Sequence, residues 1–298
     1  MNLVVKAQLN EFRKSNPSAN LEDSELFEVY SIFSVTNGIL GENVNAFDLH
    51  LRGQEFGLDG VGILVQGDVC IDSDAVAEAL QQGKKAVVDF LFFQAKTSEK
   101  LDYGDLSKFF DAIYYFFTDK LENVSDQIDD LLEAKASVYD AALSRNPNIK
   151  CYFVTTGQGD VSDAIQTLID SNRARLKELN LFNTIEIDLV GAEGLQNSYR
   201  TATNSISETI EFQKVLTLPS HNSVSEGYTG YIDAAELLKL VTIESGSDTE
   251  PKINRTIFFD NIRDFDKNSS INKAIIEELN KGDAESFIFK NNGITIVA

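Results

Sequence analysis

Cysteine, histidine and long apolar runs are scarce in this chain of 298 residues. Two cysteines, Cys70 and Cys151, cannot form a disulfide framework or a cysteine-rich zinc site, and only His50 and His221 are available for histidine-based chemistry. The longest apolar runs are short, as at 90–93, and the first residues lack a basic region followed by a long apolar one. No membrane span or secretory signal is therefore predicted, and we expect a cytoplasmic protein with no membrane partner.

Basic side chains are also few in comparison with acidic ones. The chain has 26 Lys and Arg against 47 Asp and Glu, which gives a formal net charge of −21. The acidic residues are spread along the chain, so the negative net charge does not conceal a basic domain. Strong non-specific binding to nucleic acid is not expected, because phosphate binding normally uses clustered Lys and Arg. With 43% hydrophobic and 24% charged residues, the composition predicts a packed globular core.

The hydrophobic pattern predicts an α/β protein. The stretch 84–96 is an almost continuous apolar run of strand length, which is typical of a centre strand buried on both faces. The later strand–helix–strand order favours parallel pairing. Further strands are predicted at 58–65, 69–71 after a tight turn at 66–68, 149–155 and 184–190, and helices at 21–37 with Asn20 as N-cap, 73–82 with Ser73 as N-cap, 102–119, 121–143 and 163–179.

The pattern changes beyond about residue 200. Alternating segments replace the buried runs there, and a linker is predicted at 244–251. The chain stops inside a strand pattern, at 294–297, so we expect a C-terminally truncated fragment. The predicted elements are strands at 208–218, 227–232 and 256–259 and helices at 234–240 and 270–279.

A set of polar side chains near the first predicted strands is suited to metal-dependent hydrolysis. Asp59 stands at the head of one strand, and Gln94 and Lys96 stand two residues apart at the polar end of another, so those two share a face. A carboxylate and an amide oxygen can bind a hard cation such as Mg²⁺, and an ammonium group can hold or deprotonate a water. Glu28 can add an oxygen ligand if its helix packs against the sheet.

The order of these residues resembles the PD-(D/E)XK nuclease superfamily, in its Mrr-type branch, where glutamine replaces the middle acid. The matching pieces are Phe27-Glu28, the segment 57–60 and the segment 93–98. The resemblance implies a restriction-endonuclease-like fold in which Asp59, Gln94 and Glu28 bind Mg²⁺ or Mn²⁺ and Lys96 assists the attacking water.

The chain departs from that pattern in two ways. No proline precedes Asp59, and an inserted hairpin and helix at about 66–84 lengthen the stretch before Gln94. An insertion at a sheet edge need not disturb the core. Glu55 is the alternative acid to Asp59, and Glu25 is the alternative to Glu28.

The C-terminal third resembles the AIPR family, named for abortive-infection phage resistance. The resemblance rests on an Asn-x-Arg, an Asn at the start of a helix and an Asn-Asn-Gly before a strand, in that order. Its members commonly carry a nuclease-like N-terminal region. Either these residues are structural, as caps and turns, or they converge on a polar site for a phosphate or a base; they are Asn261, Arg263, Asn272, Asn291 and Asn292.

The sequence thus predicts two parts: a restriction-endonuclease-like domain with a mixed sheet flanked by helices at 1–195, and the first part of an AIPR-type α+β module at 196–298. The expected function is metal-dependent nuclease activity in defence against phage, with DNA as the expected substrate. A homodimer and a phage-derived trigger are further implied partners. The rivals are an inactive nuclease-like protein that senses or binds nucleic acid, and an acidic DNA mimic.

Overall fold

The structure is a computed structural model, and it describes residues 2–17, 21–81, 85–141, 143–158, 161–203, 209–219, 227–243, 252–253, 273–274, 276–277 and 280–281. The chain divides into two compact units, Met1–Ile257 and Phe258–Ala298. The second unit is described only at the last three of these ranges.

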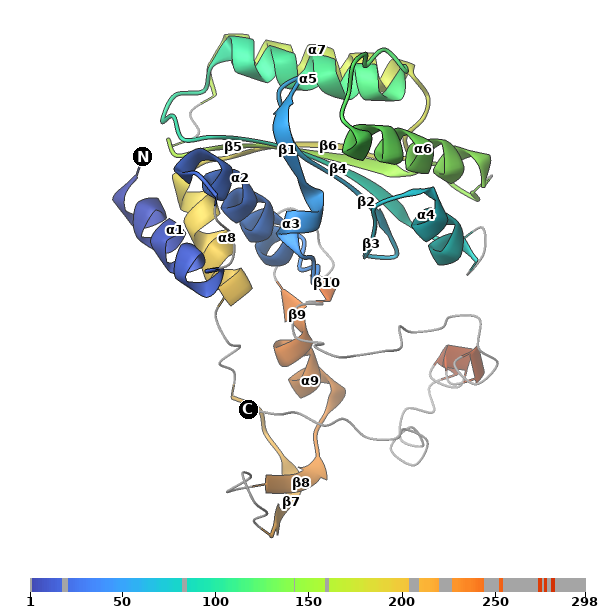
Figure 1. Ribbon diagram of the computed structural model, residues 1–298. Helices are drawn as coiled ribbons and strands as arrows, with labels where there is room; N and C mark the ends of the chain where they lie inside the picture. Colours follow the sequence, from blue (N-terminus) through green and yellow to red (C-terminus); the bar gives the residue numbers. More distant parts are fainter. Residues whose placement is uncertain are drawn as a thin grey trace. The chain divides into compact units, whose positions relative to one another are not determined.

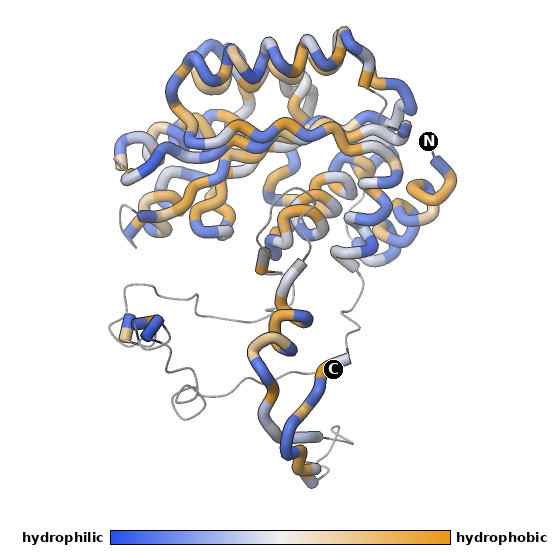
Figure 2. The backbone as a smooth tube through the Cα atoms, turned by 180° about the vertical axis from the view of Figure 1, so that it is seen from behind, coloured by the Kyte–Doolittle hydropathy of each residue, from blue (hydrophilic) through white to orange (hydrophobic). Residues whose placement is uncertain are grey.

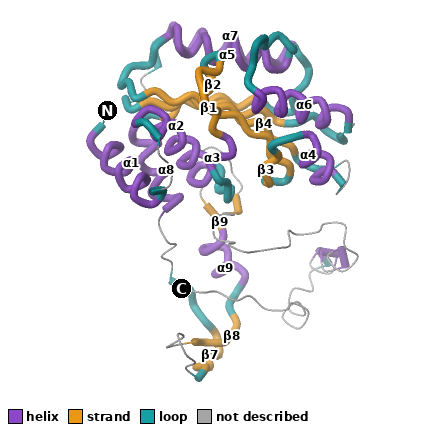
Figure 3. The backbone as a smooth tube through the Cα atoms, viewed as in Figure 1, coloured by secondary structure: helices purple, strands orange, loops and turns teal. Residues whose placement is uncertain are grey.

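The first unit is built on a mixed sheet of six strands with helices on both faces (Figures 1 and 3). Its strands are β1 (His50–Glu55), β2 (Leu58–Val65), β3 (Asp68–Cys70), β4 (Val88–Lys96), β5 (Asn148–Thr155) and β6 (Ile185–Val190). The helices that accompany this sheet are α1 (Leu3–Ser15), α2 (Asp23–Phe33), the π-helix η1 (Ser34–Ile39), α3 (Ala46–Leu49), α4 (Ser73–Leu80), α5 (Tyr103–Phe117), α6 (Asp126–Asp140), α7 (Asp163–Glu178) and α8 (Ala192–Thr203).

The strand order is β1-β2-β4-β5-β6. Strand β2 runs antiparallel to β1, β3 and β4, whereas β4, β5 and β6 are parallel, which confirms the predicted parallel pairing. β1 pairs with the first half of β2 and β3 with its second half, so these two short strands share one edge of β2. The inserted hairpin therefore extends the edge of the sheet and leaves the β2–β4 pairing intact, as predicted.

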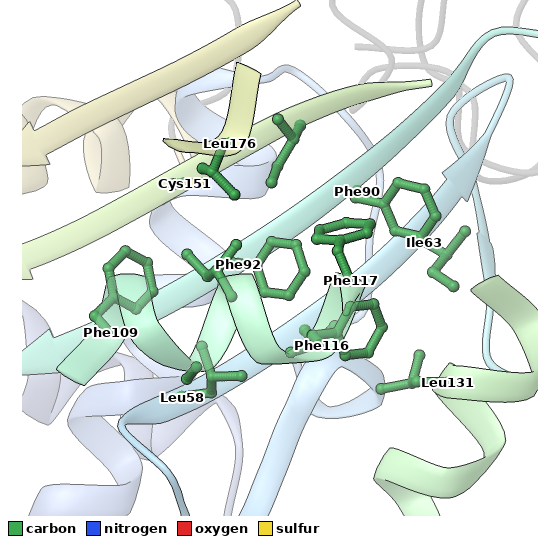
Figure 4. Close-up of a cluster of buried hydrophobic side chains, with 14 of the residues drawn as sticks. Leu58, Ile63, Phe90, Phe92, Phe109, Phe116, Phe117, Leu131, Cys151 and Leu176 are labelled. Carbon is green, nitrogen blue, oxygen red and sulfur yellow. The ribbon is translucent and has the colours of Figure 1, made fainter. Parts of the chain in front are cut away.

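Strand β4 is buried on both faces, as its apolar run predicts. Phe90 and Phe92 belong to one buried cluster, and Leu91 and Phe93 belong to the other. The first cluster packs against α5, α6 and α7, and Figure 4 shows aromatic rings of α5 meeting those of β4. The second cluster packs against α1, α2 and α8. Figure 2 shows apolar residues along the strands and on the inward sides of these helices.

Several local predictions need correction. The N-cap of α4 is Asp72, whose carboxylate accepts a hydrogen bond from Ala75 N at 2.8 Å, and not Ser73, which is the first helical residue. The N-cap of α2 is Glu22, in a capping box with Glu25, whereas Asn20 lies outside the described residues. The helix predicted at 21–37 is two elements, because α2 gives way to the π-helix η1 after Phe33. The sequence pattern also missed α1, α3, β1 and α8.

Beyond α8, the described residues form smaller elements, as the change of pattern predicts. They are β7 (Gln213–Leu218), β8 (Gly227–Tyr231), α9 (Ala234–Val241), β9 (Thr242–Ile243) and β10 (Lys252–Ile253). β7 pairs with β8 and β9 with β10, both antiparallel. The predicted boundary between residues 195 and 196 falls inside α8, where Leu195 is fully buried, and stays a prediction. The strand predicted at 256–259 and the one at 294–297 lie outside the described residues.

Within the described ranges, no helix has the length and apolar character that crossing a bilayer requires.

The close contact between η1 and α8 gives a stability prediction. A Cβ at Gly38 would lie 2.0 Å from the backbone oxygen of Ser198. Gly38→Ala should therefore push η1 away from α8 and lower the free energy of unfolding by about 2–3 kcal/mol, measured by urea denaturation. Gly194→Ala is the control, because the nearest atom to its new Cβ is 3.4 Å away and alanine favours helix, so it should not destabilise. Equal stability of Gly38→Ala and the wild type would contradict the packing.

Candidate functional site

The antiparallel pairing of β2 and β4 brings Asp59 and Gln94 together. Gly60 is the partner of Phe93, so Asp59, one residue earlier, comes opposite Gln94, one residue later. The backbone N–H of Ala95 donates to Asp59 Oδ2 at 2.7 Å. Asp59, Gln94 and Lys96 all belong to the sheet face that carries Phe92, because side chains alternate along a strand. Three of the predicted site residues thus meet where β2 begins and β4 ends.

Gln94 is the most unusual residue of this group. Its side chain is almost completely buried, at 2% exposure, and its Oε1 atom has no hydrogen-bond partner among the described residues. Leaving a buried acceptor unsatisfied costs on the order of 1–3 kcal/mol. Such a cost is expected at a position where the oxygen serves a ligand that the protein chain itself does not supply.

Lys96 is the last residue of β4 and is partly exposed. Among the described residues, its ammonium group has no ion-pair partner within salt-bridge distance. Its positive charge nevertheless acts on Asp59 and lowers the pKa of that carboxyl. Lys96 therefore lies close to Asp59 and can still contact solvent or a ligand.

Glu28 and His50 form a second pair beside Asp59. His50 Nε2 lies 2.9 Å from Glu28 Oε2, a distance at which the ring N–H donates to the carboxylate. The His50 side chain is only 4% exposed and that of Glu28 is 21% exposed. Both charges act on the pKa of Asp59, Glu28 raising it and His50 lowering it. Helix α2 packs on the face of the sheet that carries Leu91 and Phe93, so Glu28 acts on Asp59 through its charge, and its predicted place in one site with Gln94 and Lys96 stays a prediction.

His50 is the residue of this site that sequence reasoning missed. It begins β1, and its backbone oxygen also accepts a hydrogen bond from Gln127 of α6 at 3.1 Å. The segment 50–55 has no clear alternation of apolar and polar residues, so it does not read as a strand. Without that strand, the sequence contains no signal that places His50 next to Glu28.

The carboxyl group of Asp59 has a pKa raised from 3.8 to about 6. Burial is the largest cause, because it penalises the charged form, and the neighbouring charge of Glu28 adds to it. The hydrogen bond from Ala95 and the charges of Lys96 and His50 oppose the rise. A bound cation would remove much of this penalty, since it compensates the two nearby carboxylates.

Of the two alternative acids, Glu25 and Glu55, the structure describes the side chain of Glu25 only. Glu25 accepts a hydrogen bond from the Glu22 N–H at 3.3 Å in the capping box of α2, so it has a structural role. The side chain of Glu55 is outside what the structure describes. The same holds for the polar set of the C-terminal third, whose predicted convergence is therefore untested: Asn261, Arg263, Asn272, Asn291 and Asn292.

The side chains near Asp59 can be compared with the ligands that a metal ion requires. Among the described residues, no three His, Cys, Asp or Glu side chains are grouped as a metal site of those residue types would require. A cation at this place would instead depend on the Asp59 carboxylate together with the Gln94 amide oxygen, with the charge of Glu28 acting on Asp59. Carboxylate and amide oxygens suit Mg²⁺ or Mn²⁺, both of which keep water ligands, better than they suit zinc. The donor set thus fits the predicted cation, while the binding of metal stays a prediction.

In comparisons with known proteins, no family model, no curated protein and no solved structure matches this chain.

Proposed function

We propose that the chain is a metal-dependent phosphodiester hydrolase, a nuclease whose site is formed by Asp59, Gln94, Lys96 and Glu28. The observation that carries the proposal is the buried Gln94 Oε1, which has no hydrogen-bond partner among the described residues and belongs to the strand position opposite Asp59. A buried amide oxygen next to a carboxylate with a raised pKa is expected where a cation binds.

Each residue has a distinct role in this proposal. Asp59 and Gln94 hold Mg²⁺ or Mn²⁺, and Ala95 orients the Asp59 carboxylate through its N–H. When bound, such a cation supplies positive charge that polarises a phosphate and lowers the pKa of water. Lys96 holds the attacking water and stabilises negative charge that develops on the phosphate. Glu28, oriented by His50, completes the set of oxygen ligands.

The architecture agrees with the restriction-endonuclease-like fold that the motifs imply. The sheet is mixed, helices cover both faces, and the predicted site lies where the antiparallel strands β2 and β4 meet. This agreement supports the proposal only at the level of architecture. The wider proposal, an AIPR-type protein of phage defence that acts on DNA, with a homodimer and a phage-derived trigger, rests on the sequence motifs alone.

The test is a cleavage assay on purified protein. Supercoiled plasmid, single-stranded DNA and single-stranded RNA are incubated with Mg²⁺, with Mn²⁺ and with EDTA. We expect cleavage of at least one substrate with a divalent cation and none with EDTA. Binding of nucleic acid without cleavage under all conditions would favour the rival function, an inactive nuclease-like sensing protein. If the protein neither binds nor cleaves any of these substrates, the proposal is wrong.

A further inference from the structure

Strand β2 is bounded by two tight turns with the same backbone conformation. Glu55 pairs with Leu58 at one end, and Val65 pairs with Asp68 at the other, so each turn has two residues. Phe56 and Gly57 have φ angles of 51° and 89°, and Gln66 and Gly67 have φ angles of 58° and 91°. Positive φ at both positions is the mark of a type I′ hairpin turn, which favours Asn, Asp or Gly at its first position.

Phe56 is therefore an unfavourable residue type for this backbone conformation. A bulky residue at positive φ is strained, and the turn at 66–67 shows that this chain can make the same turn without an aromatic residue. Burial does not compensate the strain, because Phe56 is 47% exposed and belongs to neither buried cluster. Backbone strain and an exposed aromatic ring both cost stability, so we expect the Phe56 ring to contact a binding partner rather than to stabilise the fold.

The turn that contains Phe56 lies next to the candidate site. A Cβ at Gly57 would be 3.4 Å from Gln94 Nε2 and 3.4 Å from Lys108 Cβ, so the turn packs against both Gln94 and α5. Asp59 follows Phe56 by three residues. The turn at 66–67 lies at the other end of β2, away from these residues. The aromatic residue thus occupies the turn beside the site, and glutamine occupies the turn far from it.

We infer that the ring of Phe56 stacks on an unpaired nucleobase of the substrate, next to the phosphate that is hydrolysed. This inference rests on the proposed function. Base stacking on an aromatic ring tolerates any sequence and needs no positive charge, and each stacked base typically contributes about 5- to 100-fold in affinity. It suits a chain with a net charge of −21, which has few cations to hold a phosphate backbone.

Binding measurements with matched variants test the inference. The probes are a fluorescein-labelled single-stranded DNA oligonucleotide, the RNA of the same sequence, and the DNA strand annealed to its complement. Affinity is measured by anisotropy with Ca²⁺ in place of Mg²⁺, to limit cleavage. Phe56→Asn should weaken binding to a single strand about 10-fold, Phe56→Tyr should retain affinity within about two-fold, and Gln66→Asn should leave it unchanged.

Stability separates loss of stacking from loss of folding. Asn tolerates positive φ better than Phe or Gln does, so Phe56→Asn and Gln66→Asn should each keep or raise Tm, by about 2 °C. Weaker binding by a variant that is at least as stable as the wild type is the result that supports stacking.

Three outcomes would overturn the inference, and they differ in what else they affect. If wild-type protein cleaves nucleic acid and Phe56→Asn binds and cleaves equally well, stacking is wrong while the proposed function stands, and the ring contacts some other partner. If Phe56→Asn loses as much affinity for the duplex as for the single strand, the ring does not stack on an unpaired base. If wild-type protein neither binds nor cleaves any probe, the proposed function fails as well.

Discussion

Lys96→Ala should abolish metal-dependent cleavage while leaving the fold intact. A group that positions or activates the attacking water typically contributes about 10²- to 10⁴-fold to the rate, and the charge of Lys96, the last residue of β4, acts on Asp59 of the neighbouring strand β2. Its side chain is partly exposed and forms no ion pair with the described residues, so the free energy of unfolding should change by less than about 0.5 kcal/mol. The measurements are the initial rate of plasmid cleavage with Mg²⁺ and urea denaturation.

Lys177→Ala is the matched control for this variant. It makes the same chemical change at an exposed position of α7, near the end of that helix, and should cleave at the wild-type rate. Full activity of Lys96→Ala would remove the basis of the proposed mechanism. A loss of activity together with a loss of stability would instead assign Lys96 to the fold, and this too would count against its role in catalysis.

Asp59→Asn should have two opposite effects, a gain in stability and a loss of function. The pKa of the Asp59 carboxyl is about 6 in the folded protein and 3.8 as the ordinary value, so the folded state disfavours its ionised form. Wild-type stability is therefore reduced progressively as the pH rises from about 4 to about 6, and the reduction persists above that range. Asn cannot ionise, and its side-chain oxygen can still accept the hydrogen bond from Ala95. The variant should be more stable than the wild type by on the order of 2 kcal/mol at pH 8.

The measurement is chemical denaturation without divalent metal, at several pH values from 5 to 8. The difference between Asp59→Asn and the wild type should shrink toward pH 5, because the wild-type carboxyl is then largely protonated. Added Mg²⁺ should stabilise the wild type and not the variant, and only the wild type should cleave. Asp130→Asn, at an exposed position of α6, is the control and should show none of these effects. A variant that is less stable than the wild type at pH 8 would show that the carboxylate is favourable in the fold.

The central strands illustrate what a local pattern can predict. The observed β2, Leu58–Val65, coincides with the predicted strand, and β4, β5 and β6 lie within a few residues of the predicted ranges. β2, β4 and β5 are largely apolar because helices bury both of their faces, whereas β6 alternates apolar and acidic residues, with Glu186 and Asp188 exposed. Burial of this kind can be predicted from the local pattern of residues. Strand β1 is different: it lies at the sheet edge, its residues are largely polar, and its pairing with β2 depends on a turn rather than on an apolar run.

The same distinction separates the parts of the candidate site. The sequence by itself determined that Gln94 and Lys96 share a face of one strand, because the two-residue period of a strand is a local property. It also determined the acidity of the chain and the apolar centre of the sheet. These are properties of neighbouring residues and of composition.

Only the tertiary structure decided that Asp59 comes opposite Gln94, that His50 holds Glu28, and that Gln94 Oε1 is buried without a hydrogen-bond partner among the described residues. Each of these facts depends on the register between strands or on the packing of a helix against the sheet, and the first two join residues that are 22 or more positions apart. The physical reason is that burial and strand register are set by the whole packed core, whereas a sequence pattern reports only the periodicity of one segment.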